Sequence, residues 1–173
     1  VQGANATTIN FGLGAIPFAG VSNIVLNLGV GDDTVVASGL DLSGKLTVNG
    51  GNGNDKLNID STLLADSTLG GLTFLGGNDD DTLQIQGGIN TINGILAATM
   101  GNGINTVELG LVAGDSLTVG GLNVSGGTGD DTVTVGGDAF AVTGNTVLSL
   151  GTGVNTTTFE SALTVDLTGS VAY

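Results

Sequence analysis

The sequence contains no cysteine, histidine, arginine or tryptophan, and only two lysines. Without histidine and cysteine, the chain lacks the commonest general base, the thiol nucleophile and the usual zinc ligands. Without arginine, it lacks the bidentate clamp for carboxylate and phosphate groups. Only carboxylates, hydroxyls, Lys45 and Lys56 remain for catalysis, so we expect a protein that is not an enzyme.

Basic side chains are too few to neutralise the charge of a bound polyanion. Two Lys and Arg residues stand against 16 Asp and Glu residues, which gives a formal net charge of −14. Nucleic acids and anionic membrane surfaces both require basic residues, and no apolar run approaches the length of about 18 residues that a membrane-spanning helix needs. We therefore expect neither a nucleic-acid partner nor membrane insertion.

Proline and aromatic residues are also scarce, whereas glycine is abundant. One Pro and 3% aromatic residues accompany 33 glycines and a hydrophobic fraction of 40%. The absence of a strict Gly-X-Y period excludes collagen, and the hydrophobic fraction excludes simple disorder. Glycines that separate short runs of Val, Leu, Ile and Thr predict many strands joined by tight turns.

One short phrase returns six times: Gly, any residue, a turn residue, any residue, then Asp or Asn. Its copies follow one another every 22 to 26 residues, the spacing typical of a repeat architecture in which each repeat packs only against its neighbours. The six phrases are Gly29–Asp33, Gly51–Asp55, Gly77–Asp81, Gly101–Asn105, Gly127–Asp131 and Gly151–Asn155.

Runs with apolar residues two apart flank each phrase, as in half-buried strands. The runs after the phrases cover 34–36, 56–59, 82–85, 106–109, 132–135 and 156–159, and those before them cover 24–28, 45–48, 72–75, 95–97, 122–124 and 147–150. Residues 62–67 and 90–94 are interpreted as looser links. No segment has a convincing helical period, and the nearest candidate, 63–69, is short.

Two all-β topologies fit this pattern: a parallel β-solenoid of about six coils of ~24 residues, and an antiparallel β-sandwich. Near-identical turns favour the solenoid, because stacked turns share one environment whereas the hairpins of a sandwich do not. We expect one domain over 1–173, with an N-terminal strand within 1–20, six repeats over 21–160 and a C-terminal strand within 161–173.

Three segments, 50–58, 76–84 and 126–134, resemble the hemolysin-type calcium-binding nonapeptide, the RTX repeat G-G-x-G-x-D-x-U-x. The second departs from it at Asn78-Asp79, and the other phrases have Leu28, Met100 or Leu150 in place of the first Gly. RTX nonapeptides run in tandem and form a parallel β-roll. Here the motif recurs once in about 24 residues, so the resemblance extends to the turn alone.

The resemblance implies Ca²⁺ between stacked turns, held by carboxylates and by carbonyls of the glycine region. The expected carboxylate ligands are Asp33, Asp55, Asp79, Asp81 and Asp131, the expected glycine carbonyls are Gly51, Gly53, Gly77, Gly127 and Gly129, and Asn105 and Asn155 are expected to complete neighbouring sites.

Electrostatics supports a cation independently of this resemblance. Unit charges stacked ~4.8 Å apart repel by about 1 kcal/mol in water and by roughly 3–4 kcal/mol at an effective dielectric near 20. Ca²⁺ relieves this repulsion and accepts carboxylate and carbonyl oxygens in flexible geometry, whereas Mg²⁺ demands stricter octahedral sites. The alternative is ordinary turn chemistry, in which Asx side chains hydrogen-bond nearby backbone groups.

These features predict an extracellular or cell-surface structural protein, a calcium-stabilised β-solenoid that assembles into a fibre, surface layer or matrix. We expect a head-to-tail homopolymer, with the N-terminal segment Val1–Phe11 as a candidate strand donor to the next copy. The alternatives are an adhesin stalk module and, less favoured by composition, a β-helix enzyme acting on polysaccharides.

Overall fold

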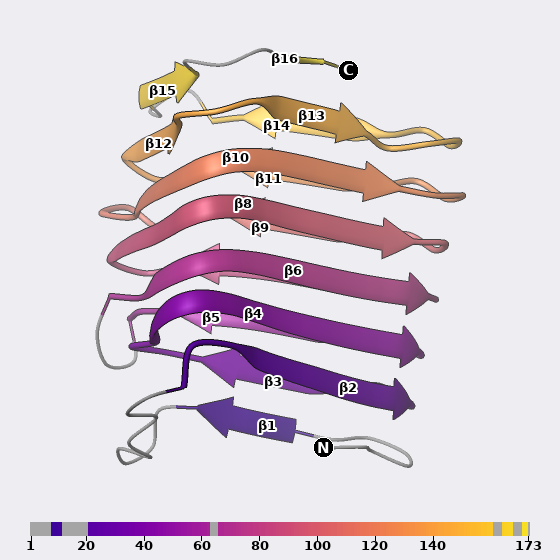
Figure 1. The fold of residues 1–173 in the computed structure, drawn as a ribbon. Helices are drawn as coiled ribbons and strands as arrows, with labels where there is room; N and C mark the ends of the chain where they lie inside the picture. The colour runs from indigo at the N-terminus through magenta and orange to yellow at the C-terminus, as the bar shows by residue number, and fades with distance from the viewer. Residues whose placement is uncertain (1–7, 12–20, 63–65, 161–163, 168–170, 173) are drawn as a thin grey trace.

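The computed structural model describes residues 8–11, 21–62, 66–160, 164–167 and 171–172, and within them all regular structure is strand. Every strand pairing is parallel. The chain winds upward coil by coil, and each coil contributes to two sheets that face each other across the core (Figure 1). The predicted parallel β-solenoid is confirmed, and the parallel pairing excludes the antiparallel sandwich.

The first sheet, which we call the short-strand sheet, has seven strands in the order β1-β3-β5-β7-β9-β11-β14. All of them are four or five residues long, and all but β1 directly follow a phrase. Their bounds are β1 Thr8–Phe11, β3 Thr34–Ala37, β5 Lys56–Asp60, β7 Thr82–Gln86, β9 Thr106–Leu109, β11 Thr132–Val135 and β14 Thr156–Phe159.

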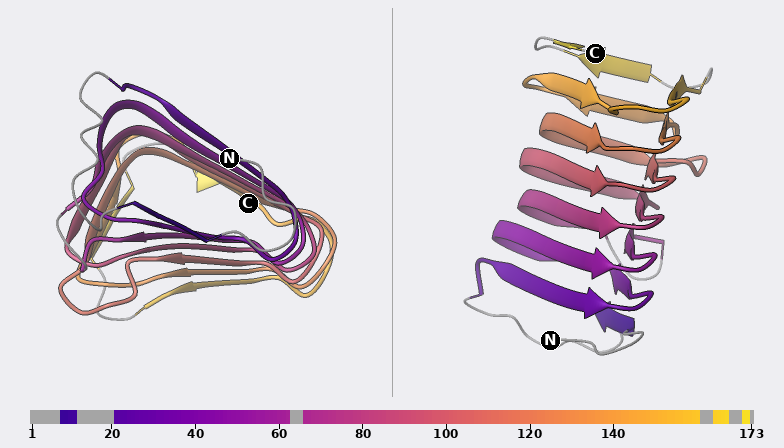
Figure 2. Two further views of the ribbon diagram at one scale, coloured as in Figure 1. Left: turned by 90° about the horizontal axis from the view of Figure 1, so that it is seen from below. Right: turned by 90° about the vertical axis from the view of Figure 1, so that its right-hand side faces the viewer.

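The second sheet, which we call the long-strand sheet, has the order β15-β12-β10-β8-β6-β4-β2, and β13 pairs with β10 and β16. Seen along the axis, each coil traces a flattened, roughly triangular outline (Figure 2). The strands are β2 Ile24–Val30, β4 Asp41–Asn52, β6 Thr68–Asn78, β8 Ile89–Gly101, β10 Ser116–Gly126, β12 Ala139–Val142, β13 Thr146–Ser149, β15 Thr164–Leu167 and β16 Val171–Ala172.

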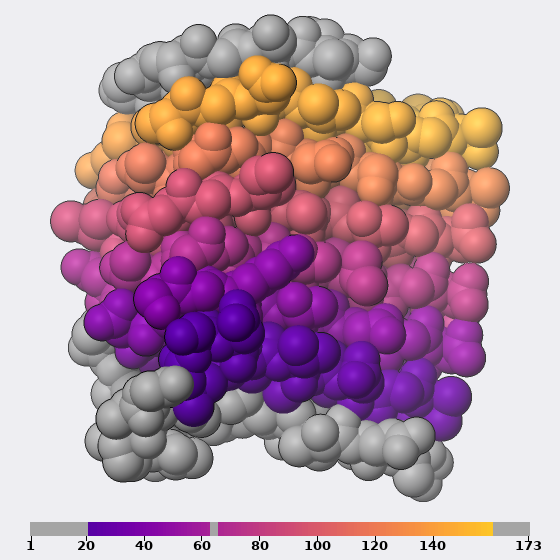
Figure 3. Space-filling model, viewed as in Figure 1, coloured from indigo at the N-terminus to yellow at the C-terminus, as the bar shows by residue number. Residues whose placement is uncertain are grey.

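Alternation in the sequence builds the core. In the short-strand sheet, Val35, Leu57 and Leu83 stack in register and are fully buried, and Leu46 and Leu72 form an equally buried column in the long-strand sheet. Residues two apart share a face of a strand, so a period-two apolar pattern places one column of aliphatic side chains inside at each step. The coils therefore pack as successive bands along one axis (Figure 3).

The long strands extend beyond the predicted runs. Residues 90–94, expected to be a loose link, lie inside β8, and the pairing of β8 with β6 shifts register between Leu69 and Leu72. Asn90 is buried there because its Nδ2 donates to the Gly87 carbonyl at 2.7 Å and its Oδ1 accepts from Ser61 Oγ at 2.6 Å. A satisfied amide can therefore occupy an inward position that sequence alone reads as a break in the strand.

Three expected segments fall partly outside the described residues. In the region 63–69, residues 63–65 are not described and Thr68 begins β6, so this candidate helix ends in a strand. Residues 1–7 and 12–20 of the N-terminal segment and 161–163, 168–170 and 173 of the C-terminal segment also lie outside the described residues. The described part of the N-terminal segment, β1, pairs with β3 of its own chain.

Candidate metal site at the stacked turns

The six phrases stack along one edge of the solenoid, where the long strands end and the short strands begin. This edge lies on the right in Figure 1 and faces the viewer in the right panel of Figure 2. Because the coils stay in register, the last residues of the phrases form a single column. This Asp/Asn column contains Asp33, Asp55, Asp81, Asn105, Asp131 and Asn155, so the structure brings these six predicted residues together.

A ladder of buried hydrogen bonds runs through the Asp/Asn column. The backbone N–H of Asp33 donates to Asp55 Oδ1 at 2.9 Å, and that of Asp55 donates to Asp81 Oδ1 at 2.9 Å. The same bond repeats from Asp81 to Asn105, from Asn105 to Asp131 and from Asp131 to Asn155. One side-chain oxygen in each step is therefore used to join coils, and not to bond the backbone of its own turn as the turn-chemistry alternative expects.

The second carboxylate oxygen has a different environment in three coils. Oδ2 of Asp55, Asp81 and Asp131 is buried and makes no hydrogen bond, although these residues are only 1–2% exposed. A buried acceptor without a partner costs about 1–3 kcal/mol, and more when it is charged. These oxygens therefore require a partner that the described residues do not supply: a proton, a water molecule or a cation.

The residue before the phrase makes room for this second oxygen. A Cβ built on Gly50 would overlap Oδ2 of Asp55, and it would lie 2.7 Å from the carbonyl oxygen of Gly76 in the next coil. Gly76 and Gly126 hold the same relation to Asp81 and Asp131, with the Met100 and Leu150 carbonyls 2.5 and 2.6 Å from the built atom. On each of these glycines, the position that a Cβ would occupy thus lies close to both a carboxylate oxygen and a main-chain carbonyl oxygen.

Two of these carboxyls, Asp55 and Asp81, hold their protons more tightly than free aspartate does. The pKa of Asp81 is raised to about 7, first by burial and then by the negative charges of Asp55, Asp79 and Asp80, and a hydrogen bond from the Asp55 backbone opposes this shift. Burial likewise raises the pKa of Asp55 to about 6, helped by Asp33, Asp32 and Asp79 and opposed by the Asp33 backbone N–H. Charge accumulation along this edge is therefore unfavourable without a counter-charge.

Elsewhere a buried acid is well satisfied. Burial acts to raise the pKa of Asp60, yet hydrogen bonds from Thr62 and Gln86 outweigh it and lower the pKa below its ordinary value. The Thr62 hydroxyl and backbone N–H and the Gln86 amide all donate to this carboxylate. Asp60 therefore needs no cation, in contrast to Asp55 and Asp81.

The predicted glycines are explained first by how closely the turns stack. Gly53 has φ +112°, and a Cβ there would lie 2.5 Å from the Gly31 carbonyl oxygen of the preceding coil. Positive φ and this close approach both require glycine. Gly51, Gly77, Gly127 and Gly129 likewise face carbonyls of the preceding coil. The carbonyls of Gly77 and Gly127 accept N–H bonds from Asn102 at 3.1 Å and Thr152 at 2.9 Å.

Asp79 lies apart from the Asp/Asn column. It stands where other phrases have Gly, and it adopts φ +76°, the left-handed region that Asp tolerates better than most residues. Its exposed side chain accepts the Gly53 N–H at Oδ2, 3.1 Å away. The departure from the nonapeptide pattern therefore keeps the turn geometry and adds a bond between coils.

Further polar ladders run along the outside of the turns. Asn54 N–H donates to Asp32 Oδ1 at 2.8 Å, and Asp80 N–H donates to Asn54 Oδ1 at 2.9 Å. An amide ladder joins Asn52 and Asn78 through a 2.8 Å bond. These bonds explain why the phrases are rich in Asn and Asp at several positions, beyond any role in metal binding.

The donor set decides which metal fits. Among the described residues, no group of three or more acidic side chains is placed to hold a metal ion. Each candidate position beside Gly50, Gly76 and Gly126 instead offers one carboxylate and one main-chain carbonyl oxygen. Ca²⁺ accepts such mixed oxygen ligands and completes its shell with water. The residues present fit a weak calcium site in these three coils.

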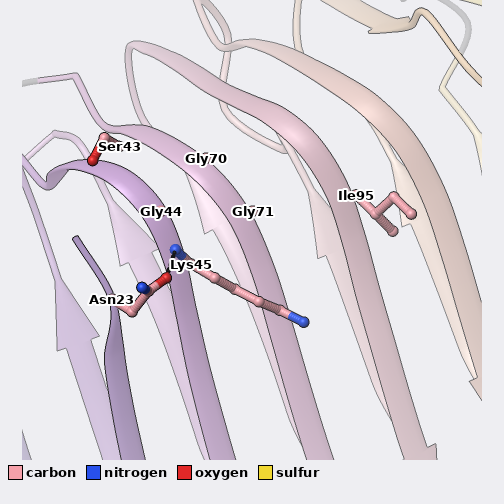
Figure 4. A pocket seen from close by; sticks show the side chains of 7 residues that line it. All are labelled: Asn23, Ser43, Gly44, Lys45, Gly70, Gly71 and Ile95. Carbon is pink, nitrogen blue, oxygen red and sulfur yellow. Dashed lines mark hydrogen bonds between the residues drawn. The ribbon is translucent and has the colours of Figure 1, made fainter.

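A shallow hollow of about 280 Å³ lies on the outer face of the long-strand sheet, lined by Asn23, Ser43, Gly44, Lys45, Gly70, Gly71 and Ile95 (Figure 4). The stem of Lys45 extends across the strand that carries Gly71. The hollow contains no carboxylate, and Lys56 belongs to the other sheet. It therefore offers no pair of groups for acid–base chemistry.

Sequence reasoning missed the role of the residue that precedes each phrase. The signal was present: Gly50, Gly76 and Gly126 precede phrases ending in Asp, whereas Met100 and Leu150 precede phrases ending in Asn. Leu28, which precedes the phrase that ends in Asp33, is the exception. The correlation becomes meaningful once the structure shows that this residue and the carboxyl compete for the same space.

Within the described residues, no helix has the length and apolarity needed to span a membrane. Comparison of the chain with protein-family models, with curated proteins and with solved structures finds no match.

Proposed function

We propose that this chain is an extracellular or cell-surface structural protein, a β-solenoid stabilised by calcium at its stacked turns. The observation that supports it is the buried, unpartnered Oδ2 of Asp55, Asp81 and Asp131, each beside a main-chain carbonyl. One carboxylate for each ion predicts weak affinity, in the ~10⁻⁴–10⁻³ M range of extracellular modules. Such sites fill only where free calcium is abundant, which favours a location outside the cell.

A structural role is further supported by the absence of catalytic groups. The composition contains no histidine, cysteine or arginine, and the lysines Lys45 and Lys56 lie on different sheets. Adhesin stalk and polysaccharide-active enzyme are the competing functions. The stalk shares the rigid solenoid, whereas an enzyme would have to rely on carboxylates, hydroxyls and two lysines alone.

Self-association along the solenoid axis is the second part of the proposal. Within the described residues, β1 and β14 each pair on one side only. The free edge of a parallel sheet can pair with a second copy, and a heterologous contact of this kind gives a filament. Because β1 already pairs with β3, the geometry favours pairing of its outer edge over donation of the whole segment Val1–Phe11.

Calcium dependence is tested by thermal unfolding in millimolar CaCl₂, in MgCl₂ and in EDTA. A ligand that binds only the folded state adds RT ln(1 + [L]/Kd), or about 1.4 kcal/mol for each site at ten times Kd. We expect Tm to rise with calcium well above its value in magnesium. An identical Tm in all three conditions would show that the turns do not bind calcium and are stabilised by hydrogen bonds alone.

Assembly is tested by electron microscopy of the same samples. We expect filaments of the intact chain and their loss when residues 1–11 are deleted, because the deletion removes the strand with the open edge. A monomeric intact protein at high concentration would overturn the polymer, and filaments of unchanged repeat from the truncated chain would exclude β1 as the contact.

A further inference from the structure

Five of the six coils fall into two kinds at the turn edge, and the coil of Asp33, whose phrase follows Leu28, belongs to neither. Where the phrase ends in Asp, the residue before that Asp is Asp or Asn, whereas Asn105 and Asn155 follow the exposed apolar residues Ile104 and Val154. The inward residue before the phrase is Gly in three of the Asp-ending coils and Met100 or Leu150 in the Asn-ending ones. We call the coils of Asp55, Asp81 and Asp131 the Gly–Asp coils, and those of Asn105 and Asn155 the Asn coils.

In the Asn coils, the side chain carries its own hydrogen-bond donor. Nδ2 of Asn105 donates to the Gly101 and Gly103 carbonyls at 3.3 Å each, and to Asp131 Oδ1 at 2.9 Å. Nδ2 of Asn155 donates to the Leu150 and Gly151 carbonyls at 3.3 Å each. The amide therefore satisfies main-chain carbonyls of its own turn.

In the Gly–Asp coils, the corresponding atom is an oxygen that cannot donate. Oδ2 of Asp55, Asp81 and Asp131 is buried without a partner and faces a carbonyl across the inward glycine. Oδ1 has the same role in both kinds of coil, since it accepts the N–H of the preceding coil. Within the Asp/Asn column, the two kinds of coil thus differ in what satisfies the second side-chain atom.

We propose that the Asn coils are metal-free spacers, in which the amides of Asn105 and Asn155 replace the calcium ion that each Gly–Asp coil takes. This inference depends on the proposed calcium function and assigns its sites. Asp55, Asp81 and Asp131 bind one ion each, which gives three ions over the described residues. Asn105 and Asn155, expected from sequence to complete neighbouring sites, bind none.

The decisive variant is Asp81→Asn, which retains the oxygen that accepts the Asp55 N–H and exchanges the unpartnered oxygen for a donor. We expect calcium titration calorimetry to show loss of one of three ions. We also expect an unchanged or higher Tm in EDTA, because the buried charge is gone. The matched charge control is Asp41→Asn. Asp41 is an exposed acid at the start of β4, and the phrase lies at the end of that strand, so this variant should still bind three ions.

The reciprocal variant Met100→Gly with Asn105→Asp converts an Asn coil into a Gly–Asp coil, and we expect it to bind a fourth ion. Two results overturn the inference. If Asp81→Asn still binds as many ions as the intact sequence, the Gly–Asp coils are not the sites, although calcium binds. If the intact sequence binds no calcium, the proposed function fails together with the inference. Calorimetry on the intact sequence separates the two failures.

Discussion

The inward glycine before a phrase is the position where one added methyl group should be most damaging. A Cβ on Gly76 would overlap Oδ2 of Asp81 and lie 2.5 Å from the Met100 carbonyl oxygen. The carboxyl would then move, and the 2.9 Å bond from the Asp55 N–H to Asp81 Oδ1 would break. The variant Gly76→Ala therefore combines overpacking with a buried donor left unsatisfied.

The size of the effect follows from these two contributions. Overpacking costs about 1–3 kcal/mol and an unsatisfied buried donor about 1–3 kcal/mol. The lower entropy of the unfolded Ala chain offsets about 0.4–1 kcal/mol. We expect Gly76→Ala to lower the free energy of unfolding by about 1–6 kcal/mol, measured by urea denaturation in EDTA with far-ultraviolet circular dichroism.

A second glycine of the same strand provides the control. A Cβ on Gly71 would meet nothing nearer than 3.6 Å, an ordinary van der Waals distance. Gly71→Ala should therefore stay within about 0.5 kcal/mol of the original sequence or gain slightly. Equal stability of the two variants would refute the idea that the glycine exists to admit the carboxyl.

Two further predictions concern the metal-free protein. The pKa values of Asp55 and Asp81, raised to about 6 and about 7, mean that these two carboxyls bind protons more tightly in the folded than in the unfolded state. Their contribution to stability in EDTA is therefore complete below about pH 4 and is lost as pH rises to about 7, whereas the lowered pKa of Asp60 contributes stability that is lost only as pH falls. Each tenfold difference in proton affinity between the folded and unfolded states is worth about 1.4 kcal/mol, and solvent near the turn edge reduces this value. Urea denaturation at several pH values measures the loss of stability. A rise in stability over this pH range would contradict the prediction. In the core, Leu83→Ala should lower the free energy of unfolding by about 2–5 kcal/mol in urea denaturation. Its half-buried neighbour provides the control, since Thr82→Ala should lower it by under about 1 kcal/mol. Similar losses of stability in the two variants would place Leu83 outside the core.

The sequence predicted the architecture because its strongest signal, the recurring phrase, is itself a consequence of stacking. Residues at equivalent positions from Asp33 to Asn155 share one environment, so they resemble one another, and the period-two runs that flank them identify the strands. The position of the candidate site at the turn edge followed directly. The ladder of N–H bonds to Oδ1 was not foreseen, since hydrogen bonding between coils leaves no signal beyond the repeat itself.

Other features depend on three-dimensional detail that local patterns do not contain. Residues 90–94 look like a link because Asn90 interrupts the apolar alternation, yet Ser61 from the preceding coil satisfies its amide oxygen. Similarly, Gly76 looks like one more turn glycine, although it faces inward, as Met100 does in the next coil. The partner of Asn90 lies 29 positions away, and Gly76 lies against both the Asp81 carboxyl and the Met100 carbonyl oxygen of the next coil.

The register of the parallel strands also governs how this chain can fold. Every rung of the ladder joins residues 22 to 26 positions apart, so each added coil closes a loop of nearly the same length and meets nearly the same entropic barrier. Folding can then propagate as a zipper from any formed pair of coils, and its rate depends on the first closure more than on the number of coils. A lesion in one interior coil would stop that propagation and divide the chain into two segments that fold separately.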